Sequence, residues 1–334
     1  TFIEGSIAVA KTVGVCRPHV ISAYPITPQT HIVEHLSELV ADGEIKSEYV
    51  NVESEHSAAS VVLGASATGA RTYTATTSQG FLLMIEVLFN IAGMRLPVVM
   101  TCVNRAVSAP INIWNDQQDS MTARDSGWIQ LYAEDNQEAS DMHLQAFKIA
   151  ENKDIMLPVM VCMDGFVLTH SFDPIELISQ EQADKFLPPF KPQYYLTPKN
   201  PLSMGTMVGP EAYMETRYFI EKTMRASLQV ISDVATDFHN QFGRFQGGLI
   251  DTYKVEDATL VLVAMGSIIG TIKDIVDELR AKGQKVGVLK VRSYRPFPKD
   301  EIYKALNHVK EIAVVEKAVS LGYGGILVNE IKSV

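Results

Sequence analysis

The stretch Glu48-Tyr-Val-Asn-Val-Glu-Ser-Glu-His-Ser-Ala-Ala-Ser60 indicates the fold most directly, because it joins an expected strand to an expected helix. Residues 58–70 are almost all small or apolar, which predicts a helix buried on all sides, and Ser54 can cap it. Glu53 and Glu55 lie between strand and helix, partly removed from water, which suits a proton donor near neutral pH. The alternative is that both acids only decorate a helix N-terminus, where negative charge is favoured.

The composition of the whole chain narrows its class. With 334 residues, 46% hydrophobic and 20% charged, it is an ordinary globular chain long enough for two domains. The net charge of -10 argues against a nucleic-acid partner. We expect no membrane association, because no apolar run approaches the roughly 20 residues of a spanning helix. Cys16, Cys102 and Cys162 are widely spaced in apolar surroundings, which favours a reducing cytoplasm over a metal site or disulfides.

Residues 1–165 alternate helix-like and strand-like segments, which predicts a parallel α/β sheet with helices on both faces. One expected strand runs into Pro25-Ile-Thr-Pro28, a rigid turn at the carboxyl end of a strand, where such sheets place their ligands. Another is followed by Ser78-Gln-Gly80, which either offers backbone donors to an anion or only turns the chain tightly. A third strand delivers Asn104-Arg105 to the same edge.

Two features of the first segment have competing interpretations. His31 and His35 are one helical turn apart, the spacing of a two-histidine metal site, but no third ligand is apparent. We therefore expect a solvated helix face and no metal. Residues 106–127 form a long irregular stretch, and a loop of this length inside a domain is usually functional.

The character of the chain changes after residue 165. Residues 166–256 contain a proline-rich arm with poor core potential, which we expect to lie across a neighbouring surface, and then a long helix over 211–243. Residues 257–334 predict a second α/β domain, in which we count only three strands and which is therefore possibly incomplete. Its Gly266–Gly270 turn has too few glycines for a dinucleotide site, so NAD is rejected.

Several short motifs, taken in order, resemble one family. They are Tyr24-Pro-Ile-Thr-Pro28, Glu53-Ser-Glu-His56, Thr76-Thr-Ser-Gln-Gly80, Asn104-Arg105 with Ile111-Asn-Ile-Trp-Asn-Asp116, and Tyr294-Arg-Pro-Phe-Pro298. Each is weak alone, but their order and spacing resemble the α subunit of the 2-oxoacid:ferredoxin oxidoreductases, most of all the pyruvate enzymes. The resemblance covers nearly the whole chain.

The resemblance implies a domain organisation. Residues 1–165 would form the α/β domain that binds the pyrimidine ring of thiamine diphosphate, with helices on both faces of a parallel sheet. Residues 166–256 would form the arm and helical linker. Residues 257–334 would form an α/β domain similar to the transketolase C-terminal domain.

The resemblance also implies roles for single residues. Glu55, rather than Glu53, would exchange a proton with the pyrimidine ring of the cofactor and so act in catalysis. Arg105 would form a forked contact with the substrate carboxylate, and Thr27 would hydrogen-bond the 2-oxoacid. Pro25 and Ile26 would line the cofactor.

The implied activity is oxidative decarboxylation of pyruvate, or the reverse synthesis, with coenzyme A and ferredoxin in anaerobic cytoplasmic metabolism. The sequence has neither a Gly-Asp-Gly metal motif nor cluster cysteines. The resemblance therefore places Mg²⁺, the diphosphate and [4Fe-4S] clusters on β, γ and δ-type partner subunits.

Three alternatives remain open at the level of sequence. The same family frame could serve another 2-oxoacid, such as a branched-chain acid, 2-oxoglutarate or oxalate. The chain could belong to a non-redox thiamine-diphosphate enzyme, such as a transketolase or a simple decarboxylase. It could also be a non-catalytic scaffold subunit, for which replacing Glu55 would leave activity untouched.

Overall fold

The larger sheet of the molecule determines where the sequence motifs meet. A computed structural model describes residues 1–334. Its seven-stranded sheet has the order β12-β6-β7-β5-β4-β2-β3, and every neighbouring pair is parallel except β12 with β6. The strands are β2 (Val20–Ser22), β3 (Glu48–Val50), β4 (Thr72–Thr76), β5 (Val99–Asn104), β6 (Ile129–Tyr132), β7 (Val159–Asp164) and β12 (Ser293–Arg295).

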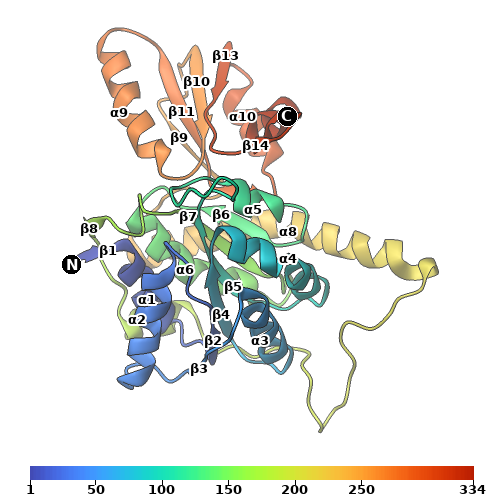
Figure 1. Cartoon of the computed structure of the whole chain (residues 1–334). Helices are drawn as coiled ribbons and strands as arrows, with labels where there is room; N and C mark the ends of the chain where they lie inside the picture. Colours follow the sequence, from blue (N-terminus) through green and yellow to red (C-terminus); the bar gives the residue numbers. More distant parts are fainter.

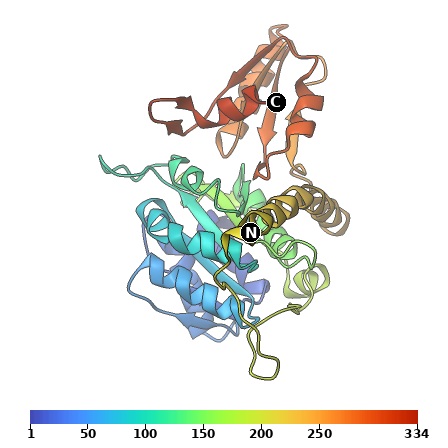
Figure 2. The ribbon, with the colours of Figure 1, turned by 90° about the vertical axis from the view of Figure 1, so that its right-hand side faces the viewer.

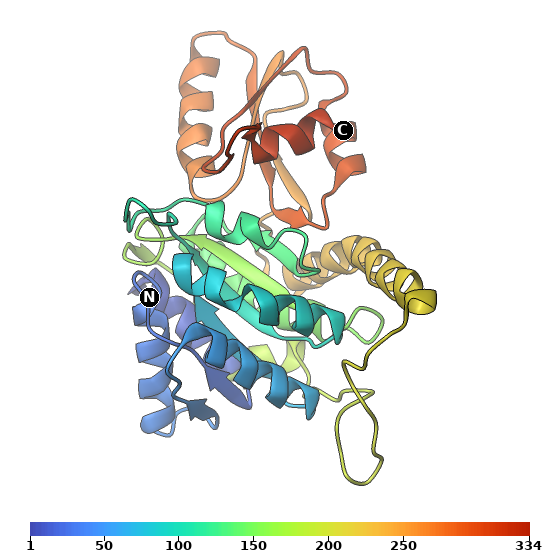
Figure 3. The same cartoon turned by 45° about the vertical axis from the view of Figure 1, so that its right-hand side comes forward.

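Helices cover both faces of this sheet, as predicted (Figures 1 and 3). One face carries α1 (Gly5–Val15), α2 (Thr30–Ala41) and α6 (Asn136–Ala150), and the other carries α3 (Glu55–Ala67), α4 (Ser78–Gly93) and the short α5 (Gln118–Thr122). Side chains alternate along β5, so Val99 and Val103 enter one core while Met100 and Cys102 enter the other. The fold class is therefore the predicted α/β class.

Helix α3 begins where the sequence predicts but is less covered than predicted. Ser54 caps it, because its hydroxyl accepts a hydrogen bond from the Ser57 N–H at 3.2 Å. The prediction that it is buried on all sides is wrong, because His56, Ser60 and Gly64 are exposed. The helix rests on the sheet and α4 with one face only. Small and apolar residues on the outer face led the sequence analysis to overestimate its burial.

The N-terminal segment and the linker frame the first unit. Strand β1 (Phe2–Glu4) pairs with β8 (Phe172–Pro174), and α7 (Gln180–Phe186) follows with a capping box. The arm of residues 187–209 is largely exposed and crosses the end of α3, where the Leu196 N–H donates to the Ala67 carbonyl at 2.8 Å. Helix α8 (Pro210–Phe242) then projects outward with its first half exposed (Figure 1).

The second unit is a four-stranded sheet of order β13-β10-β11-β9. It consists of β9 (Ile250–Tyr253), β10 (Leu260–Ala264), β11 (Val286–Val291) and β13 (Glu311–Val314), with α9 (Ile268–Ala281) on one face and α10 (Lys299–Leu306) and α11 (Ile326–Lys332) on the other. A small hairpin joins β14 (Val319–Ser320) to β15 (Gly324–Gly325). The three strands expected in residues 257–334 are present as β10, β11 and β13, and the antiparallel edge strand β9 from the preceding segment adds a fourth to this sheet. Strand β12 meanwhile leaves this unit and pairs with β6.

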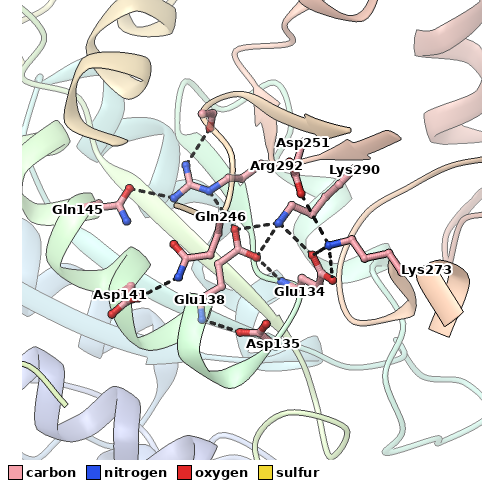
Figure 4. Close-up of polar contacts among 11 residues, drawn as sticks. Glu134, Asp135, Glu138, Asp141, Gln145, Gln246, Asp251, Lys273, Lys290 and Arg292 are labelled. Carbon is pink, nitrogen blue, oxygen red and sulfur yellow. Dashed lines mark hydrogen bonds and ion pairs between the residues drawn. The ribbon is translucent and has the colours of Figure 1, made fainter. Parts of the chain in front are cut away.

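A buried group of ion pairs joins the two units, and we call it the interdomain joint (Figure 4). The Glu138 carboxylate lies 3.0 Å from Arg292 Nε and 3.2 Å from Lys290 Nζ. Glu134 lies 3.1 Å from Lys290 and 2.8 Å from Lys273. Burial acts to lower the pKa of Lys290, but the two carboxylates outweigh it and raise that pKa. The acids come from α6 and the loop before it, and the bases from the second unit.

Candidate functional site

The carboxyl ends of β2, β4 and β5 bring three of the sequence motifs together. These strands are neighbours in the sheet, so the turns that follow them must meet at one edge. Pro25-Ile-Thr-Pro28 follows β2, Ser78-Gln-Gly80 begins α4 after β4, and Arg105 follows β5. The second unit lies at this same end of the first (Figures 1 and 2).

Arg105 is the cation at the centre of this edge. Its side chain is 6% exposed, and Nη1 donates to the Thr27 carbonyl at 2.8 Å. Nη2 lies 3.4 Å from the Gln79 side-chain oxygen, and buried Nε has no partner. Burial lowers the pKa of Arg105, and the nearby Asp119 carboxylate opposes that shift. No acidic side chain pairs with the guanidinium, so part of its hydrogen-bonding capacity is free for an anion.

Glu55 and Glu53 occupy different environments. Glu55 is 7% exposed and lies against the start of α4, where a Cβ atom on Gly80 would be only 2.5 Å from its Oε1. Its carboxylate makes no hydrogen bond or ion pair within the chain. Glu53 is exposed and accepts a hydrogen bond from the Ser57 hydroxyl at 2.6 Å, which lowers the pKa of Glu53. Of these two acids, only Glu55 is largely buried and leaves its carboxylate without a partner in the chain.

The proline turn is held by a residue that sequence analysis did not single out. Gln29 is fully buried, its Nε2 donates to the Ala75 carbonyl at 2.7 Å, and its Oε1 accepts from the Ile26 N–H at 3.2 Å. These bonds fix the turn to β4. Pro25 and Thr27 are exposed, and Ile26 is half-buried, so all three present surface at the edge.

Asp119, at the start of α5, organises the floor of the site. It is fully buried, and its Oδ2 accepts from the backbone N–H groups of Ser78 and Arg105, both at 3.0 Å. Its Oδ1 accepts from Asn104 Nδ2 and from the Ser120 N–H, both at 2.8 Å. Burial raises the pKa of the Asp119 carboxyl to about 6, although these donors act to lower it.

Ser78 shows that this floor is under constraint. Its φ of +46° lies in the left-handed region, which is costly for a residue with a side chain. Asp119 holds its N–H, and the Ser78 hydroxyl donates to the Ala106 carbonyl at 2.6 Å. Such strain persists only where surrounding contacts determine it, which is typical of functional sites.

Asp119 is predicted from the sequence only as part of the irregular stretch 106–127, and Gln29 and Gln79 are not predicted as site residues. The local signal for all three is weak, because each acts through contacts distant in sequence. The usable hint is the setting of Asp119, which lies in an irregular stretch of a length that is usually functional.

The two histidines of α2 do not converge on a common point. His31 Nδ1 lies 2.7 Å from Glu4, and its ring centroid is 4.7 Å from that of His170. His35 Nδ1 lies 3.2 Å from Glu38. His31 is thus paired rather than simply solvated. No three His, Cys, Asp or Glu side chains cluster in metal-binding geometry, and the three cysteines are free and buried.

The residues present fit the pyrimidine side of a thiamine cofactor. A buried acid without a partner lies against a glycine, and several buried polar atoms at the ends of β4, β5 and β7 lack partners in the chain. They are Thr76 Oγ1, Gln79 Nε2, Asn104 Oδ1, Arg105 Nε and Asp164 Oδ1. Because buried polar groups are normally satisfied, their concentration at one edge indicates a polar ligand.

Comparison with known proteins agrees with this geometry. Residues 11–236 match the family model "pyruvate flavodoxin/ferredoxin oxidoreductase, thiamine diP-bdg", and residues 258–334 match "pyruvate:ferredoxin oxidoreductase core domain II". The pyruvate synthase subunit PorA of Methanosarcina barkeri is 59% identical over 333 residues, which cover 99% of this chain and 83% of that protein. The ketoisovalerate oxidoreductase subunit VorA of Pyrococcus horikoshii is 47% identical over 331 residues, covering 99% and 84%.

Solved structures share the fold. A 2-oxoglutarate:ferredoxin oxidoreductase from Magnetococcus marinus superposes with a TM-score of 0.77 at 21% identity, covering 100% of this chain and 60% of that one. A split-gene transketolase gives a TM-score of 0.58 at 14% identity, covering 100% and 86%. At these identities they support the architecture alone. The family models and the relatives carry the assignment: the chain belongs to the pyruvate flavodoxin/ferredoxin oxidoreductase family, whose thiamine-diphosphate-binding domain forms its larger part.

Proposed function

We propose that this chain is the α subunit of a thiamine-diphosphate-dependent 2-oxoacid:ferredoxin oxidoreductase that decarboxylates pyruvate oxidatively, or runs the reverse synthesis, with coenzyme A and ferredoxin. The observation that carries the proposal is the 59% identity with a pyruvate synthase subunit over 333 residues. The buried acid and the buried guanidinium at one sheet edge are the groups that such a reaction needs on this side of the cofactor.

Glu55 is proposed as the residue that holds a proton at the pyrimidine ring. Its burial, its lack of a partner and its position against Gly80 support this role. Thiamine diphosphate, when bound, supplies a nucleophilic carbon for the 2-oxo group. Pro25 and Ile26 are proposed to line the cofactor, because they present surface on the turn beside β4.

Arg105 and Thr27 are proposed to bind the 2-oxoacid. The contact between Arg105 Nη1 and the Thr27 carbonyl at 2.8 Å places the two residues side by side. The guanidinium can donate to a carboxylate with the nitrogens that the chain leaves free, and the exposed Thr27 hydroxyl can meet the 2-oxo group. Both residues orient the substrate and do not transfer protons.

The chain is proposed to act in a complex, because the relatives that match it over its whole length are named as subunits. Cys16, Cys102 and Cys162 are each buried in apolar core, so [4Fe-4S] clusters are assigned to γ and δ-type partners. Mg²⁺ and the diphosphate are assigned to a β-type partner. The proposed location is the cytoplasm, as the family resemblance implies. No helix has the length and apolarity to cross a membrane.

The segments 1–165, 166–256 and 257–334 are proposed as the working domain division, with the linker contributing β9 to the second sheet.

A second substrate class has specific support, because the VorA relative at 47% identity is a ketoisovalerate enzyme subunit. The alternative is therefore the same reaction on a branched-chain 2-oxoacid.

The test is reduction of a viologen dye by the complex purified with its co-expressed partners. We expect electron transfer that requires both pyruvate and coenzyme A, and slower rates with ketoisovalerate or 2-oxoglutarate. Decarboxylation without dye reduction would instead indicate a non-redox enzyme. Calorimetry on the isolated chain adds a separate check: thiamine diphosphate with Mg²⁺ should bind far more weakly than to the complex, and micromolar binding would contradict the shared site.

A further inference from the structure

The second unit contacts the site through the residues just before Asp119. The Gln117 N–H donates to the Lys317 carbonyl at 2.9 Å, and Gln117 Nε2 lies 3.4 Å from the Met265 carbonyl. The Val319 N–H donates to Gln118 Oε1 at 3.1 Å. Three hydrogen bonds from the second unit therefore hold the entry to α5.

These contacts are reinforced at the end of β7. Asp164 Oδ2 accepts from the Ser267 N–H at 2.8 Å and lies 2.7 Å from Lys317 Nζ. Asp164 is opposite Asn104 in the β5–β7 register, and Asn104 itself donates to Asp119. The second unit thus contacts the residues just before Asp119 directly, and it also contacts the end of β7 beside Asn104, which donates to Asp119. We call these contacts the clasp.

The clasp is connected to Arg105 through Asp119. Asp119 Oδ2 receives the backbone N–H of Arg105, and the same oxygen receives the N–H of Ser78. A shift of Asp119 would therefore move two turns of the site together. The guanidinium has few other restraints, because Nη1 meets one carbonyl, Nη2 makes a 3.4 Å contact and Nε meets nothing.

We propose that Asp119 positions Arg105 for the 2-oxoacid and is itself held in place by the C-terminal domain through the clasp. This inference rests on the proposed function, because it takes Arg105 as the substrate-binding cation. Asp119 is a positioning residue and does not touch the substrate. The C-terminal domain, which meets this edge through Ser267 and Lys317 at Asp164, then also contributes to substrate affinity through Asp119.

The experiment uses the assembled complex and separates KM for pyruvate from kcat and from KM for coenzyme A. Gln118→Ala removes the acceptor for the Val319 N–H at a half-buried position and should raise KM for pyruvate about 3- to 10-fold with kcat unchanged. Gln118→Glu keeps an acceptor oxygen and should restore KM. Thr122→Ala, on the exposed side of α5, is the matched control and should change nothing.

Asp119→Asn supplies the larger change, about 10- to 100-fold in KM for pyruvate, because an amide nitrogen cannot accept the donors that meet the carboxylate. Both variants are repeated with Arg105→Ala. If Asp119 and Gln118 act through Arg105, neither should raise KM further in that background. Equal increases in both backgrounds would overturn the inference while leaving the substrate role of Arg105 intact.

The outcomes for the proposed function are distinct. If Arg105→Ala alone leaves KM for every 2-oxoacid unchanged, the assignment of Arg105 as the carboxylate ligand fails first and the inference fails with it. If Asp119→Asn does not assemble, the Gln118 series decides alone, because that side chain is half-buried and makes one interdomain bond.

Discussion

The interdomain joint and the carboxyl edge of the larger sheet both contain buried charges, but they satisfy them differently. At the joint, Glu138 has Arg292 at 3.0 Å and Lys290 at 3.2 Å, so each buried charge has an opposite charge beside it. At the edge, Glu55 has no partner and Arg105 has no acidic side chain against its guanidinium.

The difference distinguishes buried charges that stabilise the fold from buried charges that await a ligand. A largely buried charge without a counter-charge is unfavourable, so a fold keeps one only where something else completes it. At the joint, the buried charges are all paired within the chain, and these ion pairs fix how the two units lie. The edge is incomplete within the chain, which is the condition expected of a ligand site.

Glu55→Gln is expected to give the largest effect, a loss of activity, and it tests the functional role of the sheet edge. Glutamine keeps the size of the side chain but cannot exchange a proton. Turnover of pyruvate by the assembled complex should fall about 100- to 10,000-fold, while the calorimetric affinity for thiamine diphosphate changes little.

Glu53→Gln is the matched control for this prediction, because Glu53 lies two positions away and is exposed. It should cost far less activity. Hydrogen–deuterium exchange at the reactive carbon of the bound cofactor gives an independent readout. Equal exchange rates in the Glu55→Gln and unmodified complexes would leave Glu55 as only a helix-start acid, as the scaffold interpretation requires.

Glu138→Ala tests the structural side. Removing this carboxylate leaves Lys290 and Arg292 buried with fewer acidic partners, and breaking such a pair typically costs about 3–5 kcal/mol of unfolding free energy. Denaturant unfolding of the purified chain measures it. Glu221→Gln, which removes the exposed partner of Arg225 on α8, should change stability little. Similar losses in both variants would mean that the joint is no more than a surface network.

The residues of the edge can be predicted from the sequence better than those of the joint. β-Branched runs mark strands locally, and prolines and glycines mark their ends, so the sequence predicts Pro25-Ile-Thr-Pro28, Ser78-Gln-Gly80 and Asn104-Arg105 at one edge. The joint depends on Glu134 and Glu138 meeting Lys290-Val-Arg292, which lie far along the chain. That segment was interpreted only as evidence against a ribose site.

The errors have a common physical origin. The exposed face of α3 was missed because composition does not show which side of an apolar helix the rest of the chain covers. Strand β9 was missed because Ile250-Asp-Thr-Tyr253 has no run of apolar residues, and β12 was missed because it pairs in a sheet other than that of its own unit. Asp119 was missed as an organiser because its partners Ser78, Asn104 and Arg105 lie in two segments that are distant from it in sequence.

His143 provides a third case, a buried titratable group completed within the fold. Nδ1 lies 2.6 Å from the Ala139 carbonyl and Nε2 lies 2.6 Å from the Thr101 hydroxyl. Burial lowers the pKa of His143 to about 4, although the bond to Ala139 opposes this shift. The unfolded chain therefore binds more protons than the folded chain between the unperturbed pKa of about 6.5 and this value.

Stability from His143 should be present above pH 6.5 and lost as the pH falls toward 4. The loss is about 3 kcal/mol, since each pKa unit corresponds to roughly 1.4 kcal/mol. His143→Gln should remove this part of the pH dependence. Denaturant midpoints measured from pH 7 to pH 4.5 for both proteins give the comparison, and parallel curves would show that His143 does not titrate in this way.

Arg105→Ala is expected to give the smallest of these effects and sharpens the comparison most. The site arginine should be nearly dispensable for folding, because the guanidinium makes only one short hydrogen bond in the chain. It should matter for the substrate, where a lost charge-assisted hydrogen bond costs about 1.5–3 kcal/mol in apparent binding. Steady-state kinetics of the complex should show a raised KM for pyruvate with cofactor affinity unchanged. Arg105→Lys should restore binding only in part, because an ammonium cannot form the forked contact. If Arg105→Ala instead lowers the free energy of unfolding as much as Glu138→Ala does, the buried charges of the edge and of the joint both serve stability, and the distinction between them fails.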